Sequence, residues 1–295
     1  MSEARELLGV RLSSPDKVLW AEQGVTKGEL ADYYLAVAER MLPHVARRPV
    51  TLVRCPAGSE TKCFYQRHAA SGVPEQFREV TVPGFDEPYL YIEDAAGLIA
   101  AVQLGSLELH PWGVTVERPD RPDRLIFDLD PAEGLGFEAV IRAAHDVRAR
   151  LEALGLESFV KTTGGKGLHV VVPILPDTEW RAAKAFAKGV AELMSEERPD
   201  LYLARISKAE REGRIFIDYL RNDPTSTAVG PYSTRSRKGA PVSMPITWDQ
   251  VAPGLDPCAY TLRTVPDIIA RTADPWAEIG QVRQSLQQAL DQLSR

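Results

Sequence analysis

Three aspartates stand where the sequence could build a site for divalent metal ions. Asp128 and Asp130 close the apolar run 125–127, and the two-residue repeat of a strand puts both carboxylates on one face. Asp218 ends a second run of this kind, at residues 214–217. Carboxylates are hard ligands that can hold Mg²⁺ or Mn²⁺ against a polyphosphate. If the two strand ends are neighbours, the three carboxylates would form a two-metal site.

A segment with phosphate-binding residue types lies between these two runs. Residues 161–169 include Thr163, Lys166 and His169 among three glycines, so a hydroxyl, an ammonium and an imidazole could contact a triphosphate. Such glycine-rich segments are also common as plain hairpin turns, and that alternative stays open. A Walker A loop is not expected, because Gly167 stands where the magnesium-binding Ser or Thr would be needed. Together with the carboxylates, the segment favours nucleotidyl transfer.

The elements that must position these residues form a regular series between residues 125 and 219. Apolar periodicity predicts strands at 125–130, 158–161, 168–172 and 214–219. Helices are predicted at about 137–154 and about 179–194, the second with Asp177 as its cap. The order strand, helix, strand, strand, helix, strand is that of a split βαβ, ferredoxin-like or RRM-like sheet. A mixed α+β fold with the carboxylates on that sheet is therefore expected.

The flanking regions predict additional elements but no separate linker. Thr26 and Glu29 form a capping-box pattern before a helix that should end near Pro43. Strands are expected at 50–53, 89–92 and 107–110, and a docking helix at 279–293. We expect one body over residues 1–295, whose parts are an N-terminal module (about 1–120), a catalytic core (121–245) and a C-terminal packing segment (246–295).

Charge and cysteine content narrow the classes of partner. The formal charge of −6 argues against broad coating of nucleic acid, whereas residues 205–238 carry eight basic and four acidic side chains and could contact a polyanion locally. Cys55, Cys63 and Cys258 fit a reducing compartment without a disulfide framework and lack the spacing of a zinc site. No apolar run approaches the roughly 20 residues that span a bilayer. We expect a cytoplasmic location and no membrane contact.

The motifs, in this order and spacing, resemble the archaeo-eukaryotic primase superfamily, and within it the polymerase domain of bacterial DNA ligase D. The resemblance rests on Asp128 and Asp130, residues 163–169 and Asp218, and it extends to residues 16–20, 108–112 and 230–235. Thr163 departs from the serine frequent in the family, although its hydroxyl can still donate to a phosphate. The resemblance implies a primase-polymerase fold with an RRM-like catalytic sheet and an additional N-terminal α/β module, which would bind DNA ends.

The resemblance also implies a function. It indicates a template-dependent nucleotidyltransferase that adds ribo- or deoxyribonucleotides to primer 3′ ends at gaps and double-strand breaks in bacterial non-homologous end joining. It implies two Mn²⁺ or Mg²⁺ ions, with manganese stimulation and a preference for ribonucleotides. The cysteine spacing indicates that no zinc is bound, although some primases carry one. The substrates would be nucleoside triphosphates and DNA with a 5′-phosphate at a gap, overhang or break. A Ku-type end-binding protein and a DNA ligase module would be partners, in the nucleoid.

Residue roles follow from the same resemblance. Asp128 and Asp130 would bind both ions, and Asp218 the ion that activates the primer 3′-hydroxyl. The nucleotide would be bound by Thr163, Lys166, His169, His110, Arg221, Arg211 and Arg235. The last two could hold the DNA backbone instead. Lys17 and Lys27 would hold the 5′-phosphate across a gap, and Phe64 and Tyr65 would stack on a template base.

Two alternative functions remain at this point. A haloacid-dehalogenase-like phosphohydrolase also has an apolar run before Asp-x-Asp and uses the first aspartate as nucleophile. That family continues with Gly-Thr or Gly-Val, whereas this chain has Pro131 and Ala132. The second alternative is a noncatalytic module that bridges DNA ends and retains a primase fold. The chain has no Lys-x-Asp-Gly signature of a ligase, so sealing is expected from another protein or another part of the same protein.

Overall fold

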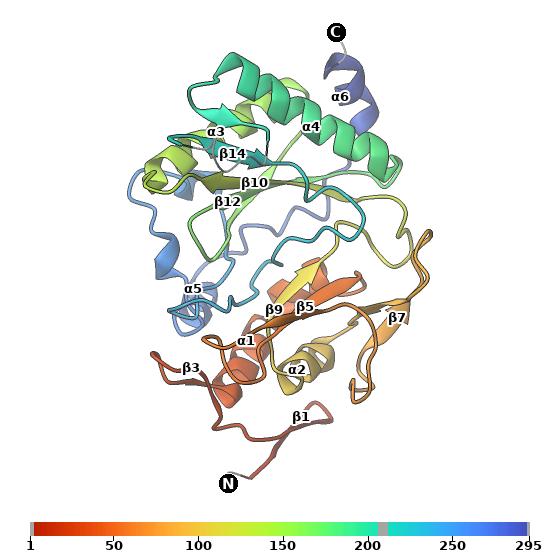
Figure 1. Ribbon diagram of the computed structural model, residues 1–295, viewed down its shortest axis with the longest axis vertical. Coiled ribbons are helices and arrows are strands. Elements are labelled where there is room, and N and C mark those ends of the chain that lie inside the picture. The colour runs from red at the N-terminus through yellow and green to blue at the C-terminus, as the bar shows by residue number, and fades with distance from the viewer. Residues whose placement is uncertain (1–2, 206–211, 294–295) are drawn as a thin grey trace. The chain divides into compact units, whose positions relative to one another are not determined.

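The computed structural model describes residues 3–205 and 212–293, which divide into two compact units (Figure 1). Unit 1 consists of Met1–Glu117, Val229–Met244 and Cys258–Asp274. Unit 2 consists of Arg118–Ala228, Pro245–Pro257 and Pro275–Arg295. Each unit is therefore assembled from three stretches of chain.

Unit 2 is built on a six-stranded sheet with the strand order β13-β14-β10-β12-β11-β15. The strands are β10 (Arg124–Pro131), β11 (Phe159–Thr162), β12 (Leu168–Pro173), β13 (Tyr202–Leu203), β14 (Ile215–Asp218) and β15 (Pro245–Ile246). The four central strands pair antiparallel in the order β14-β10-β12-β11. This is the arrangement expected of a split βαβ unit, so the predicted ferredoxin-like sheet is confirmed.

Two helices cover one face of this sheet (Figure 1). They are α3 (Phe137–Ala153) and α4 (Trp180–Glu197), and each buries an apolar stripe. On β10 the fully buried Leu125, Phe127 and Leu129 alternate with residues 126, 128 and 130, so the aspartates project from the opposite face. Ile126 on that face packs with Trp276 and Ile279 of the C-terminal stretch. The sheet thus separates an apolar layer under the helices from the face that carries the carboxylates.

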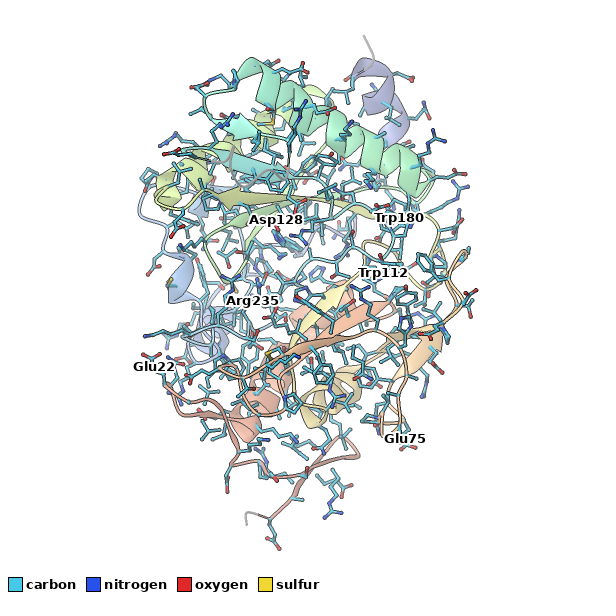
Figure 2. The ribbon with its side chains drawn as sticks, in the orientation of Figure 1. Glu22, Glu75, Trp112, Asp128, Trp180 and Arg235 are labelled. Carbon is cyan, nitrogen blue, oxygen red and sulfur yellow. A yellow bond between two sulfur atoms is a disulfide. The ribbon has the colours of Figure 1, made fainter. Side chains whose placement is uncertain are left out.

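The start of α4 differs from the prediction. Its N-cap is Glu179, and Trp180 is the first helical residue (Figure 2). Asp177 lies two residues before this cap, and its carboxylate accepts a hydrogen bond from the hydroxyl of Thr178 at 3.0 Å. The helix also continues to Glu197, beyond the predicted end near residue 194.

The C-terminal helix is shorter than predicted but docks in unit 2. Only α6 (Leu286–Leu293) is helical, with Leu286 and Ala289 buried, and it packs against α4. Before it, the Gln284 amide donates to Glu157 O at 2.8 Å and to Pro173 O at 2.7 Å. These bonds hold the chain in an irregular path where residues 279–285 were expected to be helical.

Unit 1 contains a three-stranded sheet with the order β6-β5-β9, together with helices α1 and α2. The elements are β5 (Val50–Arg54), β6 (Phe64–Gln66), β9 (Ser106–Pro111), α1 (Lys27–Val45) and α2 (Ala95–Gln103). Both hydrogen bonds of the predicted capping box join Thr26 and Glu29. Helix α1 passes through Pro43 and ends at Val45, two residues later than expected.

Shorter elements complete the two units. Unit 1 has three two-stranded hairpins and a short helix: β1 (Arg5–Leu7) with β2 (Val10–Leu12), β3 (Val18–Trp20) with β4 (Val25–Thr26), β7 (Arg78–Val80) with β8 (Tyr89–Tyr91), and α5 (Val265–Arg271). In the part of the chain that the structure describes, 3₁₀ turns lie at Trp248–Gln250 and Pro257–Ala259. Within residues 3–205 and 212–293, no helix is long and apolar enough to cross a membrane.

One expectation about the cysteines is wrong. Cys55 and Cys63 form a disulfide, with Cα atoms 4.4 Å apart. Cys55 follows β5 and Cys63 precedes β6, so the antiparallel hairpin brings the two together. A sequence separation of eight residues does not reveal this approach without the strand register. Cys258 is a free, exposed cysteine.

Candidate active site

Four side chains lie in one row across the carboxylate face of the unit 2 sheet. Asp218 of β14 is opposite Asp128 of β10, Asp128 is opposite His169 of β12, and His169 is opposite Lys161 of β11. Directly paired residues of neighbouring strands project from the same face. We call these four residues the site row. Asp130, two positions after Asp128 on β10, projects from the same face beside it.

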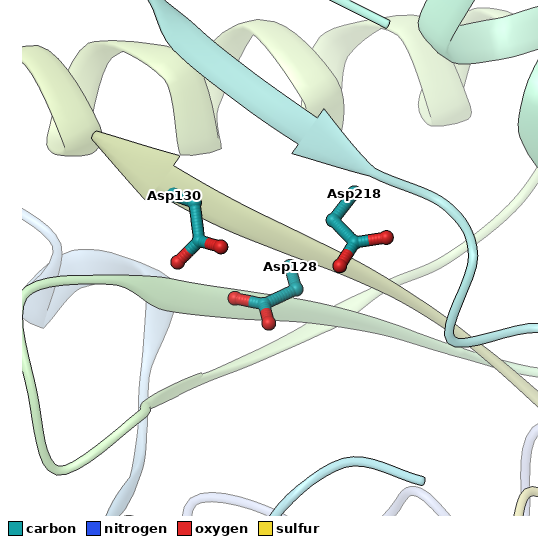
Figure 3. Close-up of side chains that lie close together, drawn as sticks. All are labelled: Asp128, Asp130 and Asp218. Carbon is teal, nitrogen blue, oxygen red and sulfur yellow. The ribbon is translucent and has the colours of Figure 1, made fainter. Parts of the chain in front are cut away.

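The three aspartates converge on one point (Figure 3). Each offers a carboxylate oxygen, and these oxygens lie within 4.8 Å of one another. Asp128 and Asp218 are buried, and Asp130 is partly buried. Among the described residues, none donates a well-aligned hydrogen bond to the buried Asp128 Oδ1. An all-carboxylate set with an unsatisfied oxygen fits a hard divalent cation such as Mg²⁺ or Mn²⁺.

Arg221 partly neutralises this cluster. One terminal guanidinium nitrogen lies 3.0 Å from Asp218 Oδ2, and Nε lies 3.4 Å from Asp128 Oδ2. Burial opposes the charge of Arg221, but the carboxylates of Asp128, Asp218 and Asp130 raise its pKa above the ordinary value. Arg221 therefore remains a cation beside the carboxylates, where it can also attract a phosphate.

The turn that carries Arg221 is fixed by a buried amide. Asn222 Oδ1 accepts a hydrogen bond from Ile126 N at 2.8 Å, and Asn222 Nδ2 donates to Ile126 O at 2.8 Å and to Tyr219 O at 2.9 Å. The side chain thereby continues the pairing of β10 beyond the end of β14. Asp218 Oδ1 also accepts a hydrogen bond from Leu220 N at 2.8 Å. These bonds set the positions of Asp218 and Arg221 relative to β10.

The row contains a neutral histidine between charged neighbours. Burial and the positive charge of Lys161 lower the pKa of His169 to about 4, although Asp128 opposes this shift. Its Nε2 lies 3.2 Å from Asp128 Oδ1. Burial raises the pKa of Asp128, but His169 lowers it most, and the charges of Arg221 and Lys161 lower it further, to about 2. Because His169 is neutral near pH 7, Arg221, whose pKa is raised, is the cation beside Asp128 at that pH.

The glycine-rich segment forms the loop of the β11–β12 hairpin. Thr163 N and Thr163 Oγ1 donate to Gly167 O at 3.2 and 3.1 Å, and Gly167 N donates to Thr163 Oγ1 at 3.3 Å. Lys166, at the loop, is exposed. A Cβ atom on Gly167 would lie 2.6 Å from Leu129 O of β10. The loop is thus packed closely against the strand that carries Asp128 and Asp130.

Two other predicted nucleotide-binding residues, His110 and Arg235, belong to unit 1 and share one partner there. His110 Nε2 and Arg235 Nε lie 2.7 and 2.8 Å from Glu108 Oε2. Arg211, which was also predicted to bind the nucleotide or DNA, lies outside the described residues.

The predicted DNA-binding residues also lie in unit 1. Phe64 and Tyr65 on β6 leave 44% and 68% of their surface exposed, so they are not core residues. The buried Lys27 donates to Ser13 O, Gln103 O and Gln103 Oε1 at 3.0, 3.2 and 2.8 Å. Burial, together with the charge of Lys17, lowers the pKa of Lys27 to about 8. Lys17 donates to Pro56 O.

No individual role was assigned from the sequence to three residues that contact the candidate site residues or their strands: Lys161, Asn222 and Glu108. For Lys161 a signal existed, because a hairpin centred on Gly165 pairs positions 161 and 169. Asn222 and Glu108 act through contacts with the backbone or with residues distant in the chain, which no local pattern reveals.

Comparisons with known proteins agree with this geometry. The model of the LigD primase-polymerase domain family matches residues 26–276. The multifunctional non-homologous end joining protein LigD of Pseudomonas aeruginosa is 35% identical over 96% of this chain, and that of Mycolicibacterium smegmatis is 38% identical over 82%. The chain spans about a third of the length of these relatives, 34% and 32%.

A solved structure supports the same assignment. The polymerase domain from Mycobacterium tuberculosis ligase D, in complex with DNA, superimposes with a TM-score of 0.85 at 33% identity, covering 92% of this chain and 98% of that one. The matches leave the phosphohydrolase interpretation without support. Because the family model matches residues 26–276 and the antiparallel pair β10 and β14 carries the three carboxylates, the chain belongs to the LigD primase-polymerase domain family.

Proposed function

We propose that this chain is a template-dependent nucleotidyltransferase that adds ribo- or deoxyribonucleotides to primer 3′ ends at gaps and double-strand breaks in non-homologous end joining. The observation that carries the proposal is the convergence of Asp128, Asp130 and Asp218 in a member of this polymerase-domain family. The relatives' names supply the repair process, and the solved relative supplies DNA as the bound partner.

Two divalent cations, Mg²⁺ or Mn²⁺, are the proposed cofactors, held by the three aspartates. When bound, such ions lower the pKa of a hydroxyl and offset phosphate charge. The chain's own contribution is electrostatic: Arg221 and Lys161 place positive charge beside the carboxylates, where it can stabilise an anionic polyphosphate. His169 remains neutral, and its Nε2 lies 3.2 Å from Asp128 Oδ1 on the neighbouring strand.

Nucleotide and DNA contacts are assigned to the residues predicted from the sequence. Lys166 is exposed at the β11–β12 loop, so its ammonium can reach a phosphate. Thr163, His169 and Arg221 are the other proposed triphosphate contacts of unit 2. His110, Arg235 and Arg211 are proposed to complete nucleotide recognition or to hold the DNA backbone.

DNA ends are proposed to engage unit 1. Phe64 and Tyr65 present exposed aromatic faces on which a base can stack. A 5′-phosphate at Lys27 would replace at least one of the three protein acceptors that its ammonium now contacts. A Ku-type protein and a ligase module are proposed partners, and the bacterial nucleoid is the proposed location.

Primer extension tests the proposed function. A gapped duplex with a 5′-phosphate would be incubated with Mn²⁺ and ribo- or deoxyribonucleoside triphosphates, using wild type, Asp128→Ala and the exposed control Asp200→Asn. We expect extension by wild type and Asp200→Asn and none by Asp128→Ala. Gap binding without extension by the wild type, at every Mn²⁺ concentration, would instead support a noncatalytic end-bridging module.

A further inference from the structure

Glu108 is a buried carboxylate in the middle of β9. It lies opposite Val53 of β5 and has only 4% of its surface exposed. His110 is two positions further along the same strand, so both side chains project from one face of the sheet. A buried carboxylate is costly unless hydrogen-bond donors surround it. The donors around Glu108 therefore indicate what it does.

Both carboxylate oxygens of Glu108 are occupied. Oε1 accepts hydrogen bonds from Ser236 N at 2.8 Å and from Ser236 Oγ at 2.6 Å. Oε2 lies 2.7 Å from His110 Nε2 and 2.8 Å from Arg235 Nε. One carboxylate thus joins the two unit 1 residues that are proposed to contact the nucleotide.

The backbone on either side of Arg235 is held independently of Glu108. Leu109 N donates to Ser233 Oγ at 2.9 Å, and Thr234 Oγ1 donates to Leu107 O at 2.5 Å. Trp20 Nε1 donates to Arg235 O at 3.1 Å. Because these bonds already attach residues 233–235 to β9 and to β3, the segment does not depend on Glu108 alone for its path.

The charge of Glu108 determines which nitrogen of His110 carries a proton and attracts the guanidinium of Arg235. Burial raises its pKa, but the bond from His110 and the charge of Arg235 together lower it to about 2, so the group is a carboxylate at neutral pH. A carboxylate only accepts hydrogen bonds, so Nε2 of His110 must carry a proton. In a neutral imidazole this makes Nδ1 the acceptor. The ion pair between Arg235 Nε and Glu108 Oε2 likewise restrains the position of the guanidinium.

We propose that Glu108 is a positioning residue for nucleotide binding, which sets the tautomer of His110 and the orientation of the Arg235 guanidinium. The proposal rests on the proposed function, because that function assigns His110 and Arg235 to the nucleotide. Glu108 contacts these two side chains and acts through them. A carboxylate behind a histidine fixes its tautomer and orientation in the same way at metal sites.

The contact between Glu108 and His110 can be tested without catalysis. Nitrogen-15 NMR of histidine-labelled protein near pH 8 would report the tautomer of each of the five imidazoles, with His110→Asn identifying the His110 signals. We expect the Nε2–H tautomer for His110 in the wild type and in the control Glu117→Gln, whose carboxylate contacts the exposed Arg47. In Glu108→Gln we expect a mixture of tautomers. A wild-type Nδ1–H tautomer would overturn the proposal even if Glu108→Gln failed to fold.

Nucleotide affinity tests whether this positioning by Glu108 strengthens nucleotide binding. The complementary ribonucleoside triphosphate would be titrated into a complex of protein and gapped DNA in the presence of Mn²⁺. The primer would carry a 3′-deoxy end, so that no extension follows. We expect Glu108→Gln to raise the nucleotide Kd about tenfold or more and to leave the DNA Kd within about twofold of wild type. In a His110→Asn, Arg235→Gln background the same change should have little further effect, because its targets are already absent.

The results distinguish the positioning role of Glu108 from the proposed polymerase function. A nucleotide Kd for Glu108→Gln within about twofold of both wild type and Glu117→Gln would overturn the positioning role while the polymerase assignment stands. An undiminished effect of Glu108→Gln in the double-variant background would show a structural role instead. If wild-type protein binds DNA but no nucleotide, the proposed function fails, and the positioning role fails with it.

Discussion

Asp128 illustrates how single residues set the chemistry of this protein. It is buried between Asp218 and His169 on adjacent strands, and the positive charges near it keep its pKa at about 2. Asp130 joins it from the same strand, and the oxygens of all three aspartates lie within 4.8 Å. Arg221 compensates only part of this negative charge. A divalent cation should therefore bind the folded protein without DNA or nucleotide.

Metal binding should stabilise the folded state. Adding Mn²⁺ at about 100 times its Kd should increase the free energy of unfolding by about 2.7 kcal/mol, because the ion binds the native state alone. In Asp130→Asn most of this increase should be lost, since one ligand is removed. Thermal unfolding of wild type, Asp130→Asn and Asp200→Asn with EDTA or Mn²⁺ measures the effect. Equal stabilisation of all three proteins would place the metal elsewhere.

Glu108 should make unit 1 sensitive to acid. Its pKa is about 2 in the folded protein against an ordinary value of 4.5, so between these values the unfolded chain binds more protons. The contribution is fully present above pH 4.5, is lost as the pH falls toward 2, and amounts to about 3 kcal/mol at most. Urea unfolding at several pH values should show a flatter acid dependence for Glu108→Gln than for wild type or Glu117→Gln. Parallel curves for all three proteins would refute this assignment.

At the scale of elements, the site depends on strand register. Periodicity of two and the Asp-x-Asp spacing were sufficient to predict β10 and its carboxylate face, because these follow from local patterns. The series of strand and helix patterns predicted the order of the four central strands. The amide of Asn222 that extends the β10 pairing, and the disulfide between Cys55 and Cys63, depend on residues brought together by folding. Neither has a local signal. Asp177 was a plausible cap by type, but Thr178 engages its carboxylate.

The close packing of the β11–β12 loop on β10 gives a test at this scale. A methyl group at Gly167 would lie 2.6 Å from Leu129 O, so the loop or the strand must move. We expect Gly167→Ala to lower the free energy of unfolding by about 1–3 kcal/mol and to reduce primer extension. Gly280→Ala is a suitable control, because a Cβ there meets nothing within 4 Å. Equal stability of the two variants, measured by urea unfolding, would contradict the packing argument.

At the scale of the whole molecule, the two units are interleaved in sequence, and this affects where the chain can be cut. Unit 2 takes β15 from residues 245–257 and Trp276 and α6 from residues 275–295. β15 pairs with β11, and Trp276 donates to Val160 O at 3.0 Å while packing near Val171. A catalytic core bounded at residues 121 and 245 therefore lacks parts of its own sheet and core.

This division predicts the behaviour of fragments. A fragment of residues 121–245 should not fold cooperatively, because the apolar face around Val171 and Phe159 loses its cover. A fragment of residues 118–295 retains every stretch of unit 2 and should keep a cooperative transition. Circular dichroism during thermal unfolding compares the two. A sharp transition in the shorter fragment would show that the C-terminal stretches are dispensable.

The central claim is that the three aspartates support nucleotidyl transfer to a primer. The most direct measurement quantifies extended primer and released pyrophosphate in the same reaction, on a gapped duplex with Mn²⁺, for wild type and Asp218→Asn. We expect one pyrophosphate for each nucleotide added by the wild type and neither product from Asp218→Asn. Pyrophosphate without extended primer, or undiminished extension by Asp218→Asn, would contradict the claim.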